Sequence, residues 1–425
     1  MLRPAHRSAL AAGALFTAVA CSSSSTAPAA QQSASALRPT AVGPPPTPSS
    51  DSRPDLSAAG NPLQLSDEQL VGQLFMTYVY GATATRATPA QRAANIALYG
   101  VPTGAQVVQR WHLGGIILID HNTLDPARPN LSTGNVGDPA QVRRLTAGLQ
   151  QAATSDSGIR LLIATDQEGG RVQRLTLGVT DRPAQRSLAQ LSATALTCSY
   201  YQLGQQLLAL GVNQNFAPVA DVAATRTGVI GDRSFGSDPV VDAAATAAAA
   251  AGLQAAGVLV TLKHWPGHGS TSTDSHAALA VIRQTAQQWH DIDRLTFAAA
   301  AGSAGAIMVG HLALPALDPS GRPASLSPVL VDKLLRGGLH YQGLIITDSL
   351  AMQPMQAAGT PGVVALQALL AGNDMLLESP DLPQAESALL SALKRDPAIR
   401  AVVRAAVGRI LTAKALTRTA GPPGC

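Results

Sequence analysis

Short apolar runs alternate along the chain with longer amphipathic or alanine-rich stretches from about Ser66 onward. The runs are mostly continuous rather than alternating between apolar and polar residues, a pattern typical of parallel strands that are buried on both faces. We expect eight strands, at residues 73–79, 114–119, 160–165, 212–219, 257–262, 305–310, 343–347 and 374–378.

The segments between these runs have the pattern of helices. Clear examples are residues 138–155, 285–303 and 327–338, and in the last of them Ser327 can cap the helix and Gly337 can end it. A strand–helix unit repeated eight times predicts an α/β fold with a single (β/α)8 barrel of the TIM type, of roughly 350 residues. A doubly wound sheet is the main alternative, but no GxGxxG motif follows the early strands to support its dinucleotide-binding version.

The first twenty residues have a different pattern. Arg3 and Arg7 precede an apolar run from Ala9 to Ala20, which is too short to span a bilayer. Residues 1–20 are therefore predicted to be a signal peptide.

A cysteine, Cys21, directly follows the small residues Ala18, Val19 and Ala20. This order resembles a bacterial lipoprotein processing site, where the new N-terminal cysteine carries lipid; ordinary secretion with an unmodified Cys21 is the alternative. Residues 21–65 hold this cysteine and a segment rich in Ser, Ala and Pro, which predicts a disordered tether. The expected location is the extracytoplasmic face of the cell membrane, with the protein anchored by lipid.

The composition suits a globular protein with a sizeable core, since 46% of the 425 residues are hydrophobic. Charged residues make up only 13%, and the formal net charge is +4. Proteins that bind nucleic acids concentrate positive charge on one face, so the composition argues against that class.

The folded part is expected at residues 66–415, followed by a C-terminal tail at 416–425. Cys198 and Cys425 are the other two cysteines of the mature chain. An oxidising exterior lets them pair if the C-terminus folds back, and two unpaired cysteines are the alternative.

Polar side chains that directly follow the predicted strands are the candidates for chemistry, because a barrel places its catalytic groups at the carboxyl ends of its strands. Together they predict a concave polar site, with no obvious phosphate cradle or thiol nucleophile. The candidates are Asp166, Asp221, Lys263, His264, His311 and Asp348.

Asp348 follows the run GLIIT and has no basic neighbour in the local sequence. Its position fits a catalytic carboxylate equally well as a helix N-cap, and the local residues leave both roles open.

The segment KHWPGHGSTSTDSH (263–276) holds three histidines, and two arrangements are open for them. Asp274 and His276 are two residues apart, which on an extended backbone points both side chains the same way, so that the carboxylate can fix the tautomer of the ring. Such an imidazole can donate and later accept a proton near neutral pH, whereas His268 is expected to be structural.

The alternative for this segment is a metal site, with His264, His268, His276 and Asp274 as ligands. The proline and glycines between them rule out the single helix that aligns ligands in HExxH motifs, so no metal and no cofactor is expected. A solvated loop whose histidines only bond to backbone is the remaining alternative.

Two further clusters combine acids and arginines. In DQEGGRVQR, Glu168 with Arg171 or Arg174 is expected to form a structural ion pair, and Asp166 is the better ligand for a hydroxyl group. In GDRSFGSD, Arg233 sits in a tight loop from which its guanidinium can grip an oxygen-rich substrate, and a salt bridge that fixes the loop is the alternative.

Six segments occur in order along the chain: ATDQEGGRVQRL, NFAPVADV, GDRSFGSDP, KHWPGHGSTSTDSH, IMVGHLALP and GLIITDSLAM. Together they resemble the bacterial β-N-acetylglucosaminidases of glycoside hydrolase family 3, over about residues 66–415. The resemblance implies one (β/α)8 barrel and a retaining mechanism that releases terminal N-acetylglucosamine (GlcNAc).

The resemblance also implies roles for single residues. Asp348 would be the nucleophile that forms a covalent glycosyl-enzyme, and His276 would be the acid/base, oriented by Asp274. The implied contacts to the hydroxyl and N-acetyl oxygens of the sugar are Asp166, Arg233, Lys263 and His264.

Ser270, Ala280 and Thr296 depart from the pattern of the family, which leaves loop conformation and substrate preference open. No second domain is expected after the barrel, which disfavours the β-glucosidase branch. The expected protein is a monomeric, lipid-anchored exo-β-N-acetylglucosaminidase that acts on peptidoglycan fragments. A phosphorylase or β-glucosidase of the same family, and a non-catalytic sugar-binding surface lipoprotein, are the alternatives.

Overall fold

The computed structural model describes residues 64–125 and 127–417. The predicted signal peptide (1–20), Cys21, nearly all of the predicted tether and Cys425 lie outside these residues. Cys198 lies in a helix within them, but the predicted bridge to Cys425 stays a prediction.

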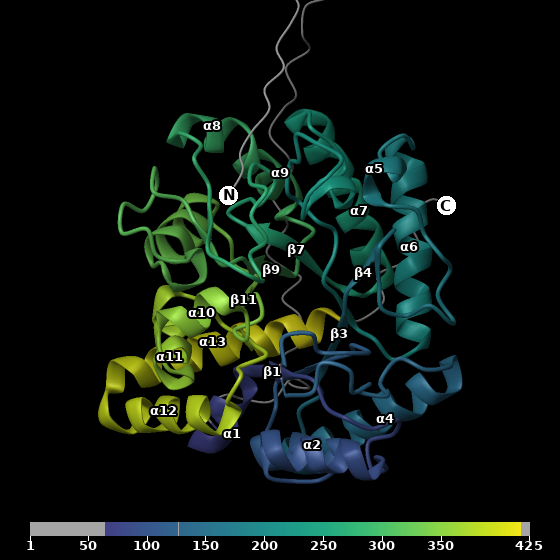
Figure 1. The fold of residues 1–425 in the computed structure, drawn as a ribbon, viewed down its shortest axis with the longest axis vertical. Helices are drawn as coiled ribbons and strands as arrows, with labels where there is room; N and C mark the ends of the chain where they lie inside the picture. Colours follow the sequence, from purple (N-terminus) through teal and green to yellow (C-terminus); the bar gives the residue numbers. More distant parts are fainter. Residues whose placement is uncertain (1–63, 126, 418–425) are drawn as a thin grey trace, which may run out of the picture. The chain divides into compact units, whose positions relative to one another are not determined.

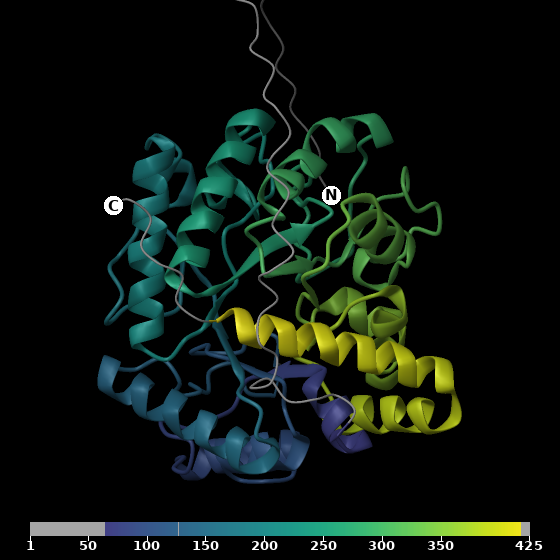
Figure 2. The same cartoon turned by 180° about the vertical axis from the view of Figure 1, so that it is seen from behind.

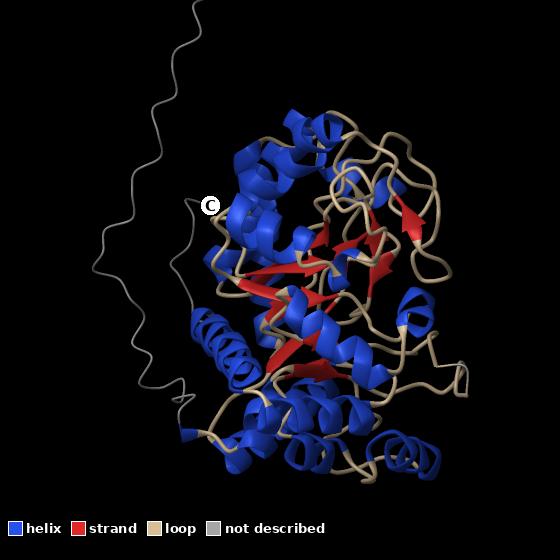
Figure 3. Ribbon diagram, turned by 90° about the vertical axis from the view of Figure 1, so that its left-hand side faces the viewer, coloured by secondary structure: helices blue, strands red, loops and turns tan. Residues whose placement is uncertain are grey.

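Eight parallel strands form the central sheet, in the order β11-β9-β7-β6-β3-β2-β1-β12. An isolated parallel bridge between Ile346 and Met375 links the two outer strands, so the sheet closes almost completely on itself. The predicted (β/α)8 barrel is confirmed, and Figure 3 shows its strands surrounded by helices. The strands are β1 (Phe75–Thr77), β2 (Gly115–Ile117), β3 (Leu162–Thr165), β6 (Gln214–Asn215), β7 (Leu259–Trp265), β9 (Ala306–Val309), β11 (Leu344–Thr347) and β12 (Leu376–Leu377).

Each predicted strand overlaps one strand of the barrel, and most of the observed strands are shorter, although β7 runs three residues beyond the predicted end at 262. The largest difference is at residues 212–219, where only β6 is regular. At the start of this segment the amide side chain of Asn213 is a physical reason, because its oxygen accepts from the backbone N–H of Ile163 at 2.7 Å and its nitrogen donates to the carbonyl of Leu161 at 3.1 Å. A side chain thus makes bonds that a longer strand would make with its backbone. At its end, Pro218 has no N–H to donate to a neighbouring strand.

Two small sheets accompany the barrel. The antiparallel pair β4 (Gln167–Gly169) and β5 (Val172–Gln173) forms a hairpin directly after β3. The parallel pair β8 (Ala280–Val281) and β10 (Leu312–Ala313) lies in the segments after β7 and β9.

Helices cover the outside of the barrel (Figure 1). Their inner faces pack on the strands in one continuous core of buried apolar side chains. They are α1 (Asp67–Gln73), α2 (Pro89–Tyr99), α3 (Gly104–Trp111), α4 (Pro139–Ser157), α5 (Gln185–Leu188), α6 (Ala193–Ala209), α7 (Pro239–Ala256), α8 (Ala286–Asp291), α9 (Asp293–Ala300), α10 (Gln353–Ala358), α11 (Pro361–Ala371), α12 (Leu382–Arg395) and α13 (Pro397–Leu416), with the shorter or wider turns η3 (Gly231–Arg233), η4 (Ala324–Leu326) and η5 (Val329–Gly338).

The three predicted helices are present with different degrees of regularity. Asp138 caps α4 by accepting from the N–H groups of its first turn, as expected for an acidic residue before a helix. The segment 285–303 is two helices, α8 and α9, because the chain breaks at Ile292 (φ −113°, ψ −78°). The segment 327–338 is a π-helix, η5, with the hydroxyl of Ser327 accepting from Leu330 N–H at 3.1 Å.

The last helix joins the first one, and Figure 2 shows α13 running beside α1. Arg400 forms two hydrogen bonds with the carboxylate of Asp67, at 2.6 and 2.9 Å, and Lys414 Nζ donates to the side chain of Gln73 at 2.6 Å. The ends of the folded chain are therefore tied together by ion pairs and hydrogen bonds. Within residues 64–125 and 127–417, no helix has the length and apolar character needed to cross a membrane.

Candidate active site

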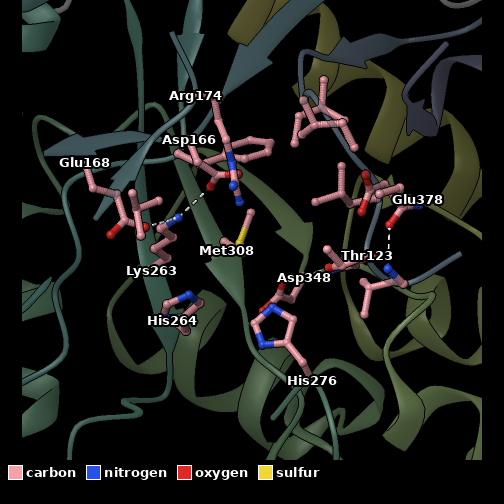
Figure 4. A pocket seen from close by; sticks show the side chains of 18 of the residues that line it. Thr123, Asp166, Glu168, Arg174, Lys263, His264, His276, Met308, Asp348 and Glu378 are labelled. Atoms are coloured by element: carbon pink, nitrogen blue, oxygen red, sulfur yellow. Dashed lines mark hydrogen bonds and ion pairs between the residues drawn. The ribbon is translucent and has the colours of Figure 1, made fainter. Parts of the chain in front are cut away.

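A pocket of about 190 Å³ lies at the carboxyl ends of the barrel strands (Figure 4). Six of the seven residues predicted for the site line it, and the seventh, Asp274, bonds to one of the six. The barrel therefore brings together side chains that are separated by up to 182 positions in the sequence, from 166 to 348. The six are Asp166, Arg233, Lys263, His264, His276 and Asp348.

One wall of the pocket is a network of buried ion pairs. Lys263 Nζ lies 2.7 Å from Asp166 Oδ1 and 2.6 Å from Glu168 Oε1. The guanidinium of Arg233 forms two bonds of 2.8 Å with the carboxylate of Glu168 in fork geometry. Burial alone disfavours the ionised form of Glu168, but Arg233 and Lys263 outweigh it and lower its pKa to about 2. Two acids and two bases thus hold each other charged and in place.

The predicted partners of Glu168 are wrong, although the prediction of an ion pair is confirmed. Arg171 instead donates to backbone carbonyls of residues 228–230, and Arg174 lies 3.7 Å from Asp166. The hairpin β4–β5 explains the difference, since Glu168 is on its buried strand whereas Arg171 lies at its turn.

The alternative for Arg233, a salt bridge that fixes its loop, is present. The same side chain also lines the pocket, so its pairing with Glu168 leaves it able to face a substrate.

His264 is held by Asp221, a fully buried residue behind the pocket. The ring Nδ1 lies 2.7 Å from Asp221 Oδ2, and the other carboxylate oxygen accepts the backbone N–H groups of His264 and His268 at 3.1 and 2.7 Å. A ring that donates from Nδ1 leaves Nε2 for the pocket. Asp221 was among the candidates at the strand ends, and its place is behind His264 rather than in the pocket.

Asp348 lies directly after β11 at the pocket. The N–H of Ser349 donates to its Oδ1 at 2.8 Å, which orients the carboxylate. Burial alone disfavours its ionised form, but His264, His311 and His276 nearby lower its pKa below the ordinary range. The helix N-cap role is wrong, because the next helix, α10, begins only at Gln353.

His311, another candidate at a strand end, lies behind this segment. Its Nδ1 is 2.8 Å from the hydroxyl of Ser325, and its Nε2 is 2.8 Å from the carbonyl oxygen of Ser349. His311 is fully buried and supports the backbone next to Asp348 rather than lining the pocket.

His276 and Asp274 form the predicted pair. His276 Nδ1 lies 2.8 Å from Asp274 Oδ1, which also accepts the backbone N–H of His276 at 2.9 Å. Both side chains are 53% exposed, and the N–H of Gln353 on α10 donates to the carbonyl of His276 at 3.3 Å. Figure 4 shows the His276 ring beside Asp348. Because Nδ1 is bonded to Asp274, Nε2 is the ring nitrogen left for a reacting group.

The three histidines of the segment 263–276 have separate partners. His268, predicted to be structural, is buried with its Nε2 3.0 Å from the hydroxyl of Ser275. In the part of the chain that the structure describes, no three His, Cys, Asp or Glu side chains are arranged to hold a metal ion. The alternative arrangement as a metal site is therefore not formed by these residues.

Several residues of the pocket escaped the sequence analysis as functional candidates. Glu378 lies at the carboxyl end of the eighth strand, so the criterion that selected the other candidates would have found it. Loop residues 121–124 come shortly after the second predicted strand, and the same criterion could have pointed to them. Arg174, which was predicted only as a possible partner of Glu168, also lines the pocket, and so do Met308, Ser349 and the apolar side chains of Ile117, Ile119, Val172, Phe216 and Leu377.

The chain is similar to known proteins over most of its length. Residues 91–413 match the glycosyl hydrolase family 3 N-terminal domain. A β-hexosaminidase from Pseudomonas aeruginosa is 36% identical over 293 residues, which cover 68% of this chain and 82% of that protein.

Solved structures show the same fold. A glycoside hydrolase family 3 β-N-acetylglucosaminidase from Paenibacillus sp. has a TM-score of 0.72 and 33% identity, over 85% of this chain and 64% of that one. A β-N-acetylhexosaminidase from Beutenbergia cavernae has a TM-score of 0.70 and 29% identity, over 83% of this chain and 99% of that one. Because the family domain matches well over half of the sequence and the barrel is shared, this chain belongs to glycosyl hydrolase family 3.

Proposed function

We propose that the protein is a retaining exo-β-N-acetylglucosaminidase, which releases terminal GlcNAc from β-linked glycosides. The names of its relatives support the activity, since the similar proteins are β-hexosaminidases and β-N-acetylglucosaminidases. The observation that carries the mechanism is that Asp348 and His276 lie in one pocket beside the wall of ion pairs, with Asp274 bonded to His276.

In the first step, a carboxylate oxygen of Asp348 attacks the anomeric carbon while the bond from that carbon to the aglycone oxygen breaks. The protonated ring of His276 gives its Nε2 proton to the departing oxygen, and Asp274 holds Nδ1 so that the ring keeps its orientation. The low pKa of Asp348 keeps the nucleophile ionised at neutral pH.

In the second step, neutral His276 takes a proton from a water molecule, whose oxygen attacks the anomeric carbon and displaces Asp348. The sugar leaves with its original anomeric configuration, and both side chains return to their starting states. A histidine in this role adds less negative charge beside the nucleophile than a second carboxylate would.

The wall of ion pairs is suited to bind the sugar. Asp166, Lys263 and Arg233 present charged donors and acceptors that are already fixed by their mutual bonds. His264 adds a ring that Asp221 has oriented. Groups that are held before the substrate arrives need little reorganisation, and so position the anomeric carbon over Asp348.

We further propose that the natural substrates are peptidoglycan fragments, with GlcNAc β-linked to N-acetylmuramic acid. The supporting observation is the predicted signal peptide with Cys21, which would anchor a monomeric enzyme by lipid outside the cytoplasmic membrane. The proposal of a lipid anchor comes from the sequence pattern at residues 1–21. Separating membranes from soluble fractions tests it, because an anchored enzyme should be found with the membranes.

The experiment that tests the activity compares 4-nitrophenyl N-acetyl-β-glucosaminide with the β-glucoside, each with and without phosphate. Release from the first in plain buffer supports the hydrolase. A phosphate requirement would indicate a phosphorylase, and a preference for the glucoside would indicate a β-glucosidase. No release under any condition contradicts the enzyme and favours a sugar-binding protein. Assay of GlcNAc release from purified muropeptides then tests the natural substrate.

A further inference from the structure

Glu378 is a carboxyl group of the pocket for which the proposed mechanism has no use. It directly follows β12 and is only 7% exposed. Its backbone is left-handed, with φ of 49°, a conformation that is uncommon for a residue with a long side chain. Residues held in such conformations cluster at ligand-binding and active sites.

Its position in the pocket is opposite the wall of ion pairs. Figure 4 shows Lys263 and His264 on one side and Glu378 on the other, with Asp348 and His276 between them. Among the described residues, no Lys, Arg or His lies within ion-pair distance of Glu378, although every carboxylate on the opposite wall has a cation. The two walls therefore offer different chemistry to a sugar that lies between them.

A terminal GlcNAc also has two different sides when its anomeric carbon lies at Asp348. One side carries the acetamido group at C2 and the hydroxyl at C3, and the other carries the ring oxygen and the hydroxymethyl group at C6, with the hydroxyl at C4 at the far end. The acetamido oxygen accepts hydrogen bonds and needs a donor, and Lys263, Arg233 and His264 supply donors on the wall of ion pairs. The single hydroxyl at C6 matches the single carboxyl on the opposite wall.

We infer that Glu378 binds the C6 hydroxyl of the terminal sugar and makes the pocket reject an anionic group at that carbon. The inference rests on the proposed glucosaminidase activity and adds a residue that determines its specificity.

The charge of Glu378 supports a hydroxyl as its ligand. Burial, with further contributions from Asp166 and Asp348, raises its pKa to about 7, although Ser349 and Arg174 act in the opposite direction. Both protonation states are thus populated near neutral pH. A hydroxyl can donate to the ionised carboxylate and accept from the protonated acid, so it is bound in either state.

The space behind Glu378 explains why an anion is rejected rather than accommodated. A second pocket of about 280 Å³ adjoins the first, and Asn122, Leu124 and Glu378 line both. No Lys, Arg or His is among the described residues that line this second pocket, and its other charged residue is Asp125. Asp125 is paired with Arg128 at 2.6 Å, which leaves Glu378 as the charged lining residue without a cation. A sulfate at C6 would therefore find room there, but no cation among the described lining residues and the carboxyl of Glu378 beside it.

The test uses three substrates with one leaving group: 4-nitrophenyl N-acetyl-β-glucosaminide, its 6-deoxy analogue and its 6-sulfate. For the wild type, we expect kcat/KM to fall about tenfold without the hydroxyl and about a hundredfold or more with the sulfate. In Glu378→Met, kcat/KM on the 6-deoxy analogue should come within about twofold of kcat/KM on the parent substrate. In Glu378→Gln, kcat/KM on the 6-sulfate relative to the parent substrate should rise about tenfold above the wild-type value. Glu386→Gln, a carboxyl lost from α12 outside the pocket, should change neither ratio.

Several results would overturn the inference. One is a wild-type enzyme that hydrolyses the 6-deoxy analogue within twofold of the parent, a measurement that needs no variant. Another is a Glu378 variant that loses activity equally on all three substrates, which would make Glu378 a support for Ser349 only. If the wild type does not hydrolyse the parent substrate at all, the proposed function fails instead, so the two failures are distinguishable.

Discussion

Glu168→Gln is the change that best separates a structural ion pair from a catalytic acid in this pocket. The glutamine keeps the shape of the side chain but removes its charge, and so leaves Arg233 and Lys263 buried beside a neutral group. We expect a destabilised protein whose remaining activity keeps the pH profile of the wild type, because Glu168 transfers no proton in the proposed mechanism.

The size of the expected loss of stability follows from the pKa of Glu168. A decrease from 4.5 to about 2 corresponds to ~3 kcal/mol in favour of the ionised form in the folded protein, at about 1.4 kcal/mol for each tenfold change in proton affinity. Loss of one partner from a buried ion pair costs about 3–5 kcal/mol, which agrees. For about 350 ordered residues the entropy of unfolding is about 0.7 kcal/mol/K, so the expected decrease in Tm is about 4 °C.

The effect must also depend on pH. Because the pKa of Glu168 is lower in the folded protein, its stabilising effect is complete above the unfolded pKa of about 4.5 and is lost as the pH falls toward 2. The difference in unfolding free energy between wild type and variant should decrease to about 2 kcal/mol by pH 3.5.

Differential scanning calorimetry at pH 7 and at pH 3.5 to 5 measures both expectations. The control is Asp232→Asn, because its partner Arg171 lies 3.4 Å away with both side chains largely exposed, and such pairs contribute less than about 1 kcal/mol. A Glu168→Gln variant with the Tm of the wild type at pH 7 refutes the reasoning. If that variant also lost its turnover, Glu168 would be a catalytic acid or base.

Three further predictions concern the chemistry. Asp348→Ala should lower kcat at least about 10⁴-fold with an unchanged circular dichroism spectrum, and a 2-fluoro sugar should label Asp348 in the wild type; a label on another residue contradicts the assignment. Asp274→Asn should lower kcat/KM about 10²-fold for a sugar leaving group but much less for dinitrophenol, because dinitrophenol departs without a proton. Equal losses on both substrates would argue against an acid role for His276. A chelator should leave activity unchanged, and a loss that added zinc restores would show that a metal takes part.

The barrel was predictable because buried parallel strands require continuous apolar runs, and residues 343–347 and 257–262 show this pattern without ambiguity. The rim residues were predictable for the same reason, since Lys263, His264 and Asp348 directly follow such runs. The strand ends thus indicated most of the pocket.

Contacts across the barrel were not predictable from local sequence. Glu168 has arginines three and six positions away, yet it pairs with Arg233 and Lys263, which are 65 and 95 positions away and come near only when the sheet closes. The break at Ile292 was hidden too, because no Gly or Pro lies beside it in the sequence to mark the end of a helix.

The contacts between α13 and α1 have a consequence for how the enzyme is made. Arg400 holds Asp67, and Arg409 bonds to the buried Asp374 at 2.7 Å, directly before β12. The strand that completes the barrel and the helix that secures it are thus among the last parts of the domain to be synthesised. While a ribosome still holds these residues, the strand that carries the nucleophile has no closed barrel around it. We therefore expect the barrel to become active only after β12 and α13 have left the ribosome.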